Sequence, residues 1–183
     1  NITEDVATHG VVAGNHGGHF LIGLMNHDSV DIHREASRAI ANLLSSFDNH
    51  SEIIQDGLPG LIHLAVSTDN ECQYNAALAF RKLGPNLSSH RGIVENGGLQ
   101  SLFFLAAVRD FKVRRQAAVA LRDLSANPDH KMQFVDEGGF KTLLSLVRDQ
   151  SEELQTLAIA SFRHLSLDDR LKRGIVECGS MPG

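Results

Sequence analysis

A period of 40 to 41 residues constrains the fold more than any other feature of the chain. Four leucines mark it at steps of 40, 41 and 41 residues: Leu43, Leu83, Leu124 and Leu165. Alanine stands seven residues before each of these final leucines: Ala36, Ala76, Ala117 and Ala158. Larger apolar residues stand three residues before them: Ile40, Phe80, Leu121 and Phe162. The positions eleven residues before them are also apolar: Ile32, Cys72, Val113 and Leu154. Residues at these spacings share one face of an α-helix, so each repeat is predicted to end in an amphipathic helix.

A second, shorter apolar stripe precedes this helix in each repeat, as in Leu99, Leu102, Phe103 and Leu105. Before that stripe stands a short motif of an apolar pair, a polar pair and glycine: IVENGG at 93–98, FVDEGG at 134–139, IVECGS at 175–180 and IIQDGL at 53–58. Glycine adopts φ > 0 without steric cost, and its lack of a side chain lets two helices meet at a sharp angle. The motif is therefore predicted to be a corner between a brief first helix and a second helix. A phosphate-binding loop would need a preceding strand and a pattern such as G-x-G-x-x-G, which the chain lacks.

A period of 40 to 41 residues fits armadillo or HEAT solenoids and WD40 blades, and excludes ankyrin and tetratricopeptide arrays. The helical stripes and the absence of tryptophan argue against blades. The stretches HRGIVENGGLQSLFFLAAVRDFKVRRQAAVALRDLSAN and HKMQFVDEGGFKTLLSLVRDQSEELQTLAIASFRHLS resemble the three-helix unit of the armadillo repeat family. This resemblance predicts an all-α, right-handed α-solenoid of armadillo repeats. A HEAT-like solenoid is the alternative.

The resemblance predicts one solenoid with units at about 1–47 (degenerate), 48–86, 87–127, 128–167 and 168–183 (partial). The first unit departs from the corner pattern at VVAGNHGGHF, so the path of residues 1–20 stays open. The chain stops at VECGSMPG without the polar cap that closes a solenoid, and we expect a fragment of a longer array.

Composition argues against several other functions. The net charge of −5 argues against nucleic-acid binding, and no apolar run reaches the length of a membrane helix. Two cysteines without a C-x-x-C pair predict no disulfide framework or zinc site, and an intracellular protein is expected. His9, His16 and His19 lack a nearby carboxylate or thiol to complete a metal site. No nucleophile, base and orienting group fall together, so we expect no enzyme and no cofactor.

Three further residues receive structural interpretations. His50 and His90 share a position at the start of the brief first helix, where polar capping residues on the surface are expected. Cys72 aligns with apolar residues and is predicted to be a small core residue.

The armadillo resemblance implies a binding module, in which the final helices of the repeats, called third helices here, line a concave groove that receives an extended segment of a partner. The side opposite the apolar stripe carries the positions one, two, five and nine residues before each final leucine. Position one is asparagine in importin-alpha-like armadillo proteins, where it holds the ligand backbone, and only Asn42 keeps it. Position five, tryptophan in nuclear-signal receptors, lacks that residue throughout, so binding of nuclear signals is not expected.

Seven of the side chains at these positions are basic, and Asp123 is the one acid among them. The predicted partner-binding residues are Arg34, Arg38, Asn42, Tyr74, Arg81, Lys82, Arg115, Arg122, Asp123, Arg163 and His164. One interpretation is that these arginines pair with acids one turn away or in the neighbouring repeat. The other is a groove for an extended protein segment that is acidic or phosphorylated. A structural spacer in a cytoskeletal, ciliary or other large assembly is the alternative function.

Overall fold

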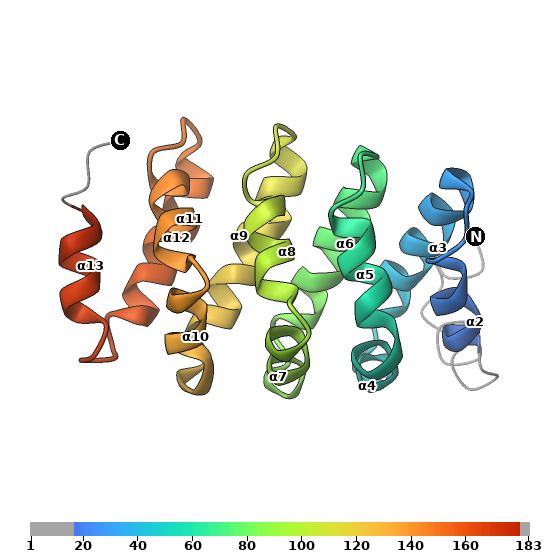
Figure 1. The fold of residues 1–183 in the computed structure, drawn as a ribbon, viewed down its shortest axis with the longest axis horizontal. Coiled ribbons are helices and arrows are strands. Elements are labelled where there is room, and N and C mark those ends of the chain that lie inside the picture. The colour runs from blue at the N-terminus through green and yellow to red at the C-terminus, as the bar shows by residue number, and fades with distance from the viewer. Residues whose placement is uncertain (1–16, 180–183) are drawn as a thin grey trace.

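The computed structural model describes residues 17–179, so His9, His16 and the two ends of the chain lie outside the described residues. Within this range the chain is helical and contains no strand. The helices stack side by side in chain order, from α2 (Gly17–Leu24) at one end to α13 (Lys172–Gly179) at the other (Figure 1). The predicted all-α solenoid is confirmed.

Three helices recur in each central repeat. One repeat consists of α7 (Leu87–Glu95), α8 (Gly98–Leu105) and α9 (Phe111–Ala126). The next consists of a 3-10 turn, η3 (Pro128–His130), followed by α10 (Lys131–Asp136), α11 (Gly139–Val147) and α12 (Glu152–Leu165). The earlier one consists of η1 (Phe47–Asn49), α4 (His50–Glu52), η2 (Ile53–Gly57), α5 (Leu58–Ala65) and α6 (Asn70–Leu83). At the N-terminal end the described chain begins with α2 and the third helix α3 (Val30–Leu43).

The predicted apolar stripe of the third helices forms the core. The four final leucines are at most 1% exposed, and the four alanines seven residues before them are at most 2% exposed. Ile32 and Phe162, on the first and last third helices, are only half-buried. The third helices α3, α6, α9 and α12 pack on one another more extensively than the second helices α5 and α8 do. This asymmetry places the third helices on the inner side of the solenoid.

Aspartates fix where two of the third helices begin. Asp69 Oδ1 accepts hydrogen bonds from the backbone N–H groups of Glu71 and Cys72, at 3.1 and 3.0 Å. Asp110 Oδ1 accepts from Lys112 and Val113, at 2.7 and 3.2 Å. Such caps satisfy backbone donors that have no partner within the helix. They hold the N-terminal ends of α6 and α9 at equivalent places in adjacent repeats.

The glycine corner is confirmed at two of its four occurrences. Gly97 and Gly138 have φ of 83° and 107°, values that favour glycine, and each joins a first helix to a second. A Cβ on the following Gly139 would lie 2.3 Å from the Phe134 ring, so the second glycine allows the close helix contact. At the echo near residue 57 the prediction is wrong. Gly57 has φ of −92° because the π-helical turn η2 runs directly into α5.

The prediction for His50 and His90 is also wrong, because both imidazoles are buried. His50 Nε2 lies 3.1 Å from the carbonyl oxygen of Leu44, at the end of the preceding third helix. The other ring nitrogen, Nδ1, lies 3.3 Å from the side-chain amide of Asn86, which caps α7, the first helix of the next repeat. Each histidine thus joins two repeats, and Lys131 occupies the equivalent position one repeat after His90. A polar residue of this type is stable in the core only with such partners.

Cys72 is fully buried on α6, as predicted for a core residue. Burial raises the pKa of its thiol to about 12, which leaves the thiol protonated and unreactive. Between residues 17 and 179, no helix has both the length and the apolar character needed to cross a membrane.

Candidate functional site

The predicted partner-binding residues lie on the partly exposed side of the third helices, here called the third-helix face. Nine of them are half-buried: Arg34, Arg38, Asn42, Tyr74, Lys82, Arg115, Arg122, Asp123 and His164. The other two, Arg81 and Arg163, are exposed. All eleven side chains are thus at least partly accessible to solvent. The charged ones differ chiefly in whether they form ion pairs or hydrogen bonds with other residues of the chain.

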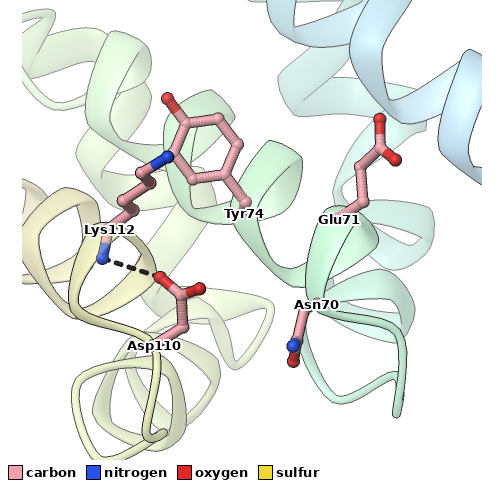
Figure 2. Close-up of a pocket in the computed structure, with 5 residues that line it drawn as sticks. All are labelled: Asn70, Glu71, Tyr74, Asp110 and Lys112. Carbon is pink, nitrogen blue, oxygen red and sulfur yellow. Dashed lines mark hydrogen bonds between the residues drawn. The ribbon is translucent and has the colours of Figure 1, made fainter.

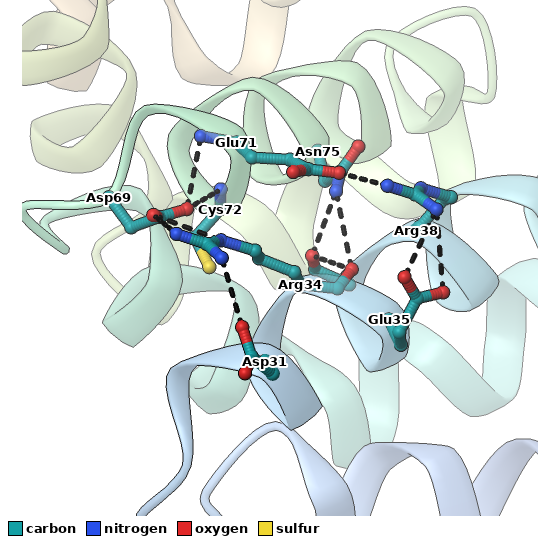
Figure 3. Close-up of polar contacts among 9 residues, drawn as sticks. Asp31, Arg34, Glu35, Arg38, Asp69, Glu71, Cys72 and Asn75 are labelled. Carbon is teal, nitrogen blue, oxygen red and sulfur yellow. Dashed lines mark hydrogen bonds and ion pairs between the residues drawn. The ribbon is translucent and has the colours of Figure 1, made fainter.

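An ion-pair network covers the face where α3 meets the N-terminal end of α6 (Figure 3). The guanidinium of Arg34 donates to Asp69 Oδ2 from Nε at 3.1 Å and from Nη2 at 2.7 Å. Its third nitrogen donates to Asp31 Oδ1 at 2.9 Å. The hydrogen bonds from Arg34 hold the pKa of Asp69 well below its usual range. The guanidinium of Arg34 is therefore already paired with carboxylates of this chain.

Arginines five and nine residues before the final leucines follow the same rule. Arg38 pairs with Glu35 on its own helix at 3.1 Å and with Glu71 on α6. Arg115 on α9 pairs with Glu153 on α12, and the adjacent Arg114 pairs with Asp149 in the loop before α12. These pairs link one repeat to the next.

Lys82 is held by the preceding repeat in another way. Its ammonium donates to the carbonyl oxygen of Ala41 at 2.6 Å and to the hydroxyl of Ser45 at 2.8 Å. Burial, followed by the nearby charge of Arg81, lowers the pKa of Lys82. This lysine fastens α6 to the C-terminal end of α3.

Arg81, Arg122 and Arg163 stand at equivalent positions near the C-terminal ends of α6, α9 and α12. Arg122 donates to Oδ1 of the adjacent Asp123 from Nε at 2.9 Å and from Nη2 at 2.7 Å. Within residues 17–179, no acidic side chain forms an ion pair with Arg81 or Arg163. Among the predicted partner-binding residues, these two arginines are the exposed cations whose charge the described chain does not neutralise.

A serine and a histidine meet at the same end of the face. Ser125 Oγ lies 3.3 Å from His164 Nδ1, which also lies 3.2 Å from the carbonyl oxygen of Arg122. The serine is fully buried, and its hydroxyl donates to that same carbonyl at 2.7 Å. Because the hydroxyl proton is already used and the oxygen is shielded, this pair is a packing contact between α9 and α12.

Tyr74 lies in a different environment from the other residues nine before a final leucine. It borders a pocket of about 340 Å³ between the N-terminal halves of α6 and α9 (Figure 2). The other lining residues are Asn70, Glu71, Asp110 and Lys112. No arginine among residues 17–179 lines this pocket, in contrast to the junctions on either side of it.

Sequence reasoning missed the acids that neutralise the arginines. Asp69, Glu71 and Glu153 lie at or before the first turn of the next third helix, outside the four positions that were predicted to line the groove. Acids in that turn are favoured by the helix dipole, and this preference is the signal that could have identified them. The predicted excess of positive charge is therefore reduced to a few side chains.

Comparison with known proteins identifies the fold. No protein-family model matches the chain, and no curated protein matches it. Designed armadillo repeat proteins for modular peptide recognition share 22% identity over 99% of this chain and 78% of theirs, with a TM-score of 0.91. A designed armadillo repeat protein in complex with the peptide (KR)4 shares 21% identity over 98% of this chain and 77% of its own, with a TM-score of 0.89.

An engineered protein is similar as well, at 27% identity over 97% of this chain and 74% of its own, with a TM-score of 0.88. These likenesses cover nearly the whole chain and agree with the repeat period, the glycine corners and the packed third helices. The chain is an α-solenoid with the armadillo-repeat fold, as its sequence predicted.

Proposed function

We propose that this chain is a non-catalytic interaction scaffold that binds an extended, acidic segment of a partner protein across its third helices. The observation that carries the proposal is the pair Arg81 and Arg163. Both are exposed on the third-helix face, and neither forms an ion pair with an acid of the described chain. A carboxylate or a phosphate of a partner can meet each planar guanidinium with two hydrogen bonds.

The similar designed proteins support the mode of binding. One group is described as made for modular peptide recognition, and another such protein is in complex with the basic peptide (KR)4. The chain shares their fold, which supports a peptide ligand. Its exposed arginines favour the opposite ligand charge.

The spacing of the arginines sets the expected distance between the acids of the ligand. Neighbouring packed helices lie about 8–10 Å apart, so Arg81 and Arg163, two repeats apart, are separated by about 16–20 Å. An extended chain rises about 3.3 Å per residue, so the two acids that meet them are about five or six residues apart. Arg122 stands between them in the row of repeats. It forms an ion pair with Asp123 but is partly exposed, so it can also contact an acid in the middle of the segment. Phosphorylation of the segment would strengthen binding by adding charge and acceptor oxygens.

Selection from a displayed library of random peptides tests this proposal. Wild-type protein should enrich peptides with acids about five or six residues apart, and the Arg81→Glu/Arg163→Glu variant should not. The matched control is Arg91→Glu/Arg173→Glu, which changes the net charge equally at two exposed residues on α7 and α13. This control should enrich the same peptides as the wild type.

Two outcomes would overturn the proposal. If the wild type enriches basic peptides, the proposed negative charge of the ligand is wrong. Failure of the wild type to enrich any sequence family would favour the structural spacer, which holds no ligand in its groove.

A further inference from the structure

The pocket beside Tyr74 marks a break in a pattern that the chain otherwise repeats. At the junction of α3 with α6, Arg34 reaches across to Asp69, and at the junction of α9 with α12, Arg115 reaches across to Glu153. Both arginines stand nine residues before a final leucine. Tyr74 occupies that position at the middle junction, and it cannot supply the charge.

The carboxylate that would receive the missing arginine is nevertheless present. Asp110 stands at the same place in its repeat as Asp69, and both cap the following helix through Oδ1. In Asp69 the second oxygen, Oδ2, accepts two hydrogen bonds from the guanidinium of Arg34. In Asp110 no described residue donates to Oδ2. One carboxylate oxygen beside the pocket thus lacks the cation that its counterpart holds.

We propose that this pocket binds the guanidinium of an arginine in the partner segment. The guanidinium would pair with Oδ2 of Asp110, as Arg34 pairs with Asp69, and would lie against the ring of Tyr74. Planar guanidinium groups pair well with carboxylates and stack on aromatic faces. The volume of about 340 Å³ is at the lower end of the usual range for ligand pockets and suits one side chain.

Two charged neighbours sharpen the prediction. Glu71 is already paired with Arg38, which leaves Asp110 as the principal acceptor. Lys112 is exposed at the rim of the pocket, and no described residue pairs with its ammonium. This lysine repels an incoming cation and attracts an incoming anion. Replacing it with a neutral residue should therefore strengthen binding of a cation and weaken binding of an anion.

The orientation of the segment rests on the proposed function, which lays an extended chain across the third helices. Tyr74 and Arg81 are seven residues apart on α6, which corresponds to about 10 Å along the helix axis. Adjacent side chains of an extended chain point to opposite sides. The partner segment is therefore expected to carry an arginine directly next to the acid that meets Arg81.

A small probe tests the pocket without requiring the acidic segment to bind. N-acetyl-arginine methylamide is titrated into the full chain labelled with ¹⁵N, and the backbone amides of Tyr74, Asp110 and Lys112 are followed by NMR. Saturable shifts of these amides are expected at about millimolar concentrations of the probe. The matching citrulline amide has almost the same shape without the charge, and it should cause no saturable shift.

Three variants give the decisive comparisons. Asp110→Asn keeps the helix cap, because asparagine is also a favoured capping residue, and should weaken binding of the arginine probe by about fivefold or more. Lys112→Gln should strengthen it by about twofold to fivefold. Asp69→Asn alters the equivalent carboxylate that Arg34 already occupies and should leave binding at the pocket unchanged. A melting curve for each variant shows whether the fold is kept, and Tyr74→Leu replaces Asp110→Asn if that variant is unfolded.

The proposal is wrong if the citrulline amide binds as well as the arginine amide, or if no saturable shift occurs near Tyr74. It is also wrong if Lys112→Gln weakens binding of the arginine probe, because a cation held in this pocket must bind more tightly once the positive charge at its rim is removed. A positive result with arginine amide, combined with failure of the acidic-peptide selection, would keep the pocket and reject the proposed acidic ligand.

Discussion

His90 Nε2 lies 2.6 Å from the carbonyl oxygen of Gly84, at the end of the preceding third helix. The side-chain amide of Asn127, which caps the 3-10 turn η3 of the next repeat, lies 3.2 Å from the other ring nitrogen, Nδ1. Asn127 Oδ1 accepts a hydrogen bond from the backbone of Asp129, which orients the amide with its N–H groups toward the histidine. These partners suit a neutral imidazole that donates from Nε2 and accepts at Nδ1.

The first prediction is that this histidine makes stability depend on pH. Burial lowers the pKa of His90 from its ordinary value of 6.5, so the unfolded chain takes up this proton more readily than the folded chain. The contribution to stability is present above the unfolded pKa of about 6.5 and is lost as the pH falls below that value. The His90→Gln variant can still donate to Gly84 but does not titrate. Its free energy of unfolding, measured by urea denaturation, should fall less over this range than that of the wild type. Equal slopes for the two proteins would contradict the prediction.

The second prediction concerns Ala117, which is fully buried on α9. A leucine at this position overpacks the core and should cost about 1–3 kcal/mol in the free energy of unfolding. Arg122→Ala removes a partly exposed side chain paired with its neighbour and should cost about 0–1 kcal/mol. Thermal unfolding should therefore show a larger decrease in Tm for Ala117→Leu. The reverse order would mean that the inward face of the third helices is wrongly assigned.

The third prediction separates backbone conformation from packing at a glycine. A Cβ on Gly138 would meet no atom within 4 Å, but φ of 107° is unfavourable for any other residue. Gly138→Ala should therefore lower stability by about 1–2 kcal/mol through backbone strain alone. Gly23, on α2, also has free space but no positive φ, so Gly23→Ala should be neutral or stabilise by about 0.5–1 kcal/mol. Chemical denaturation of both variants checks the difference. A Gly138→Ala variant as stable as Gly23→Ala would refute the role assigned to the corner.

The sequence predicted the third helices well because their burial follows a short-range period. Ala76, Ala117 and Ala158 each stand seven residues before a final leucine, which is about two helical turns. The alanine and the leucine therefore lie on the same side of the helix, and this side faces the core in each repeat. Gly57 was predicted less well, because the motif there is shortened and a π-helical turn replaces the corner. A pattern within one repeat does not specify how the chain adjusts to the helix α2 packed beside it.

The site was harder to predict because its partners lie one repeat away. Arg34 and Asp69 are 35 residues apart, and Arg38 and Glu71 are 33 apart, so neither pair follows a helical spacing. Which acid meets which arginine depends on the offset between stacked repeats. Arg81 and Arg163 were in the predicted set, but only the structure distinguishes them from the arginines whose charges are already paired.

The binding of an acidic segment to the third-helix face is the central claim, and its affinity for one synthetic peptide tests it most directly. The probe is a fluorescent peptide of about twelve residues in which glutamate and alanine alternate, so that an acid can meet each arginine in any register. Binding to the wild type, measured by fluorescence anisotropy, should weaken as salt rises from about 50 to about 500 mM. The Arg81→Glu/Arg122→Glu/Arg163→Glu variant should bind at least about tenfold more weakly while its melting temperature stays close to that of the wild type. Equal affinity of the two proteins for the peptide would contradict the claim.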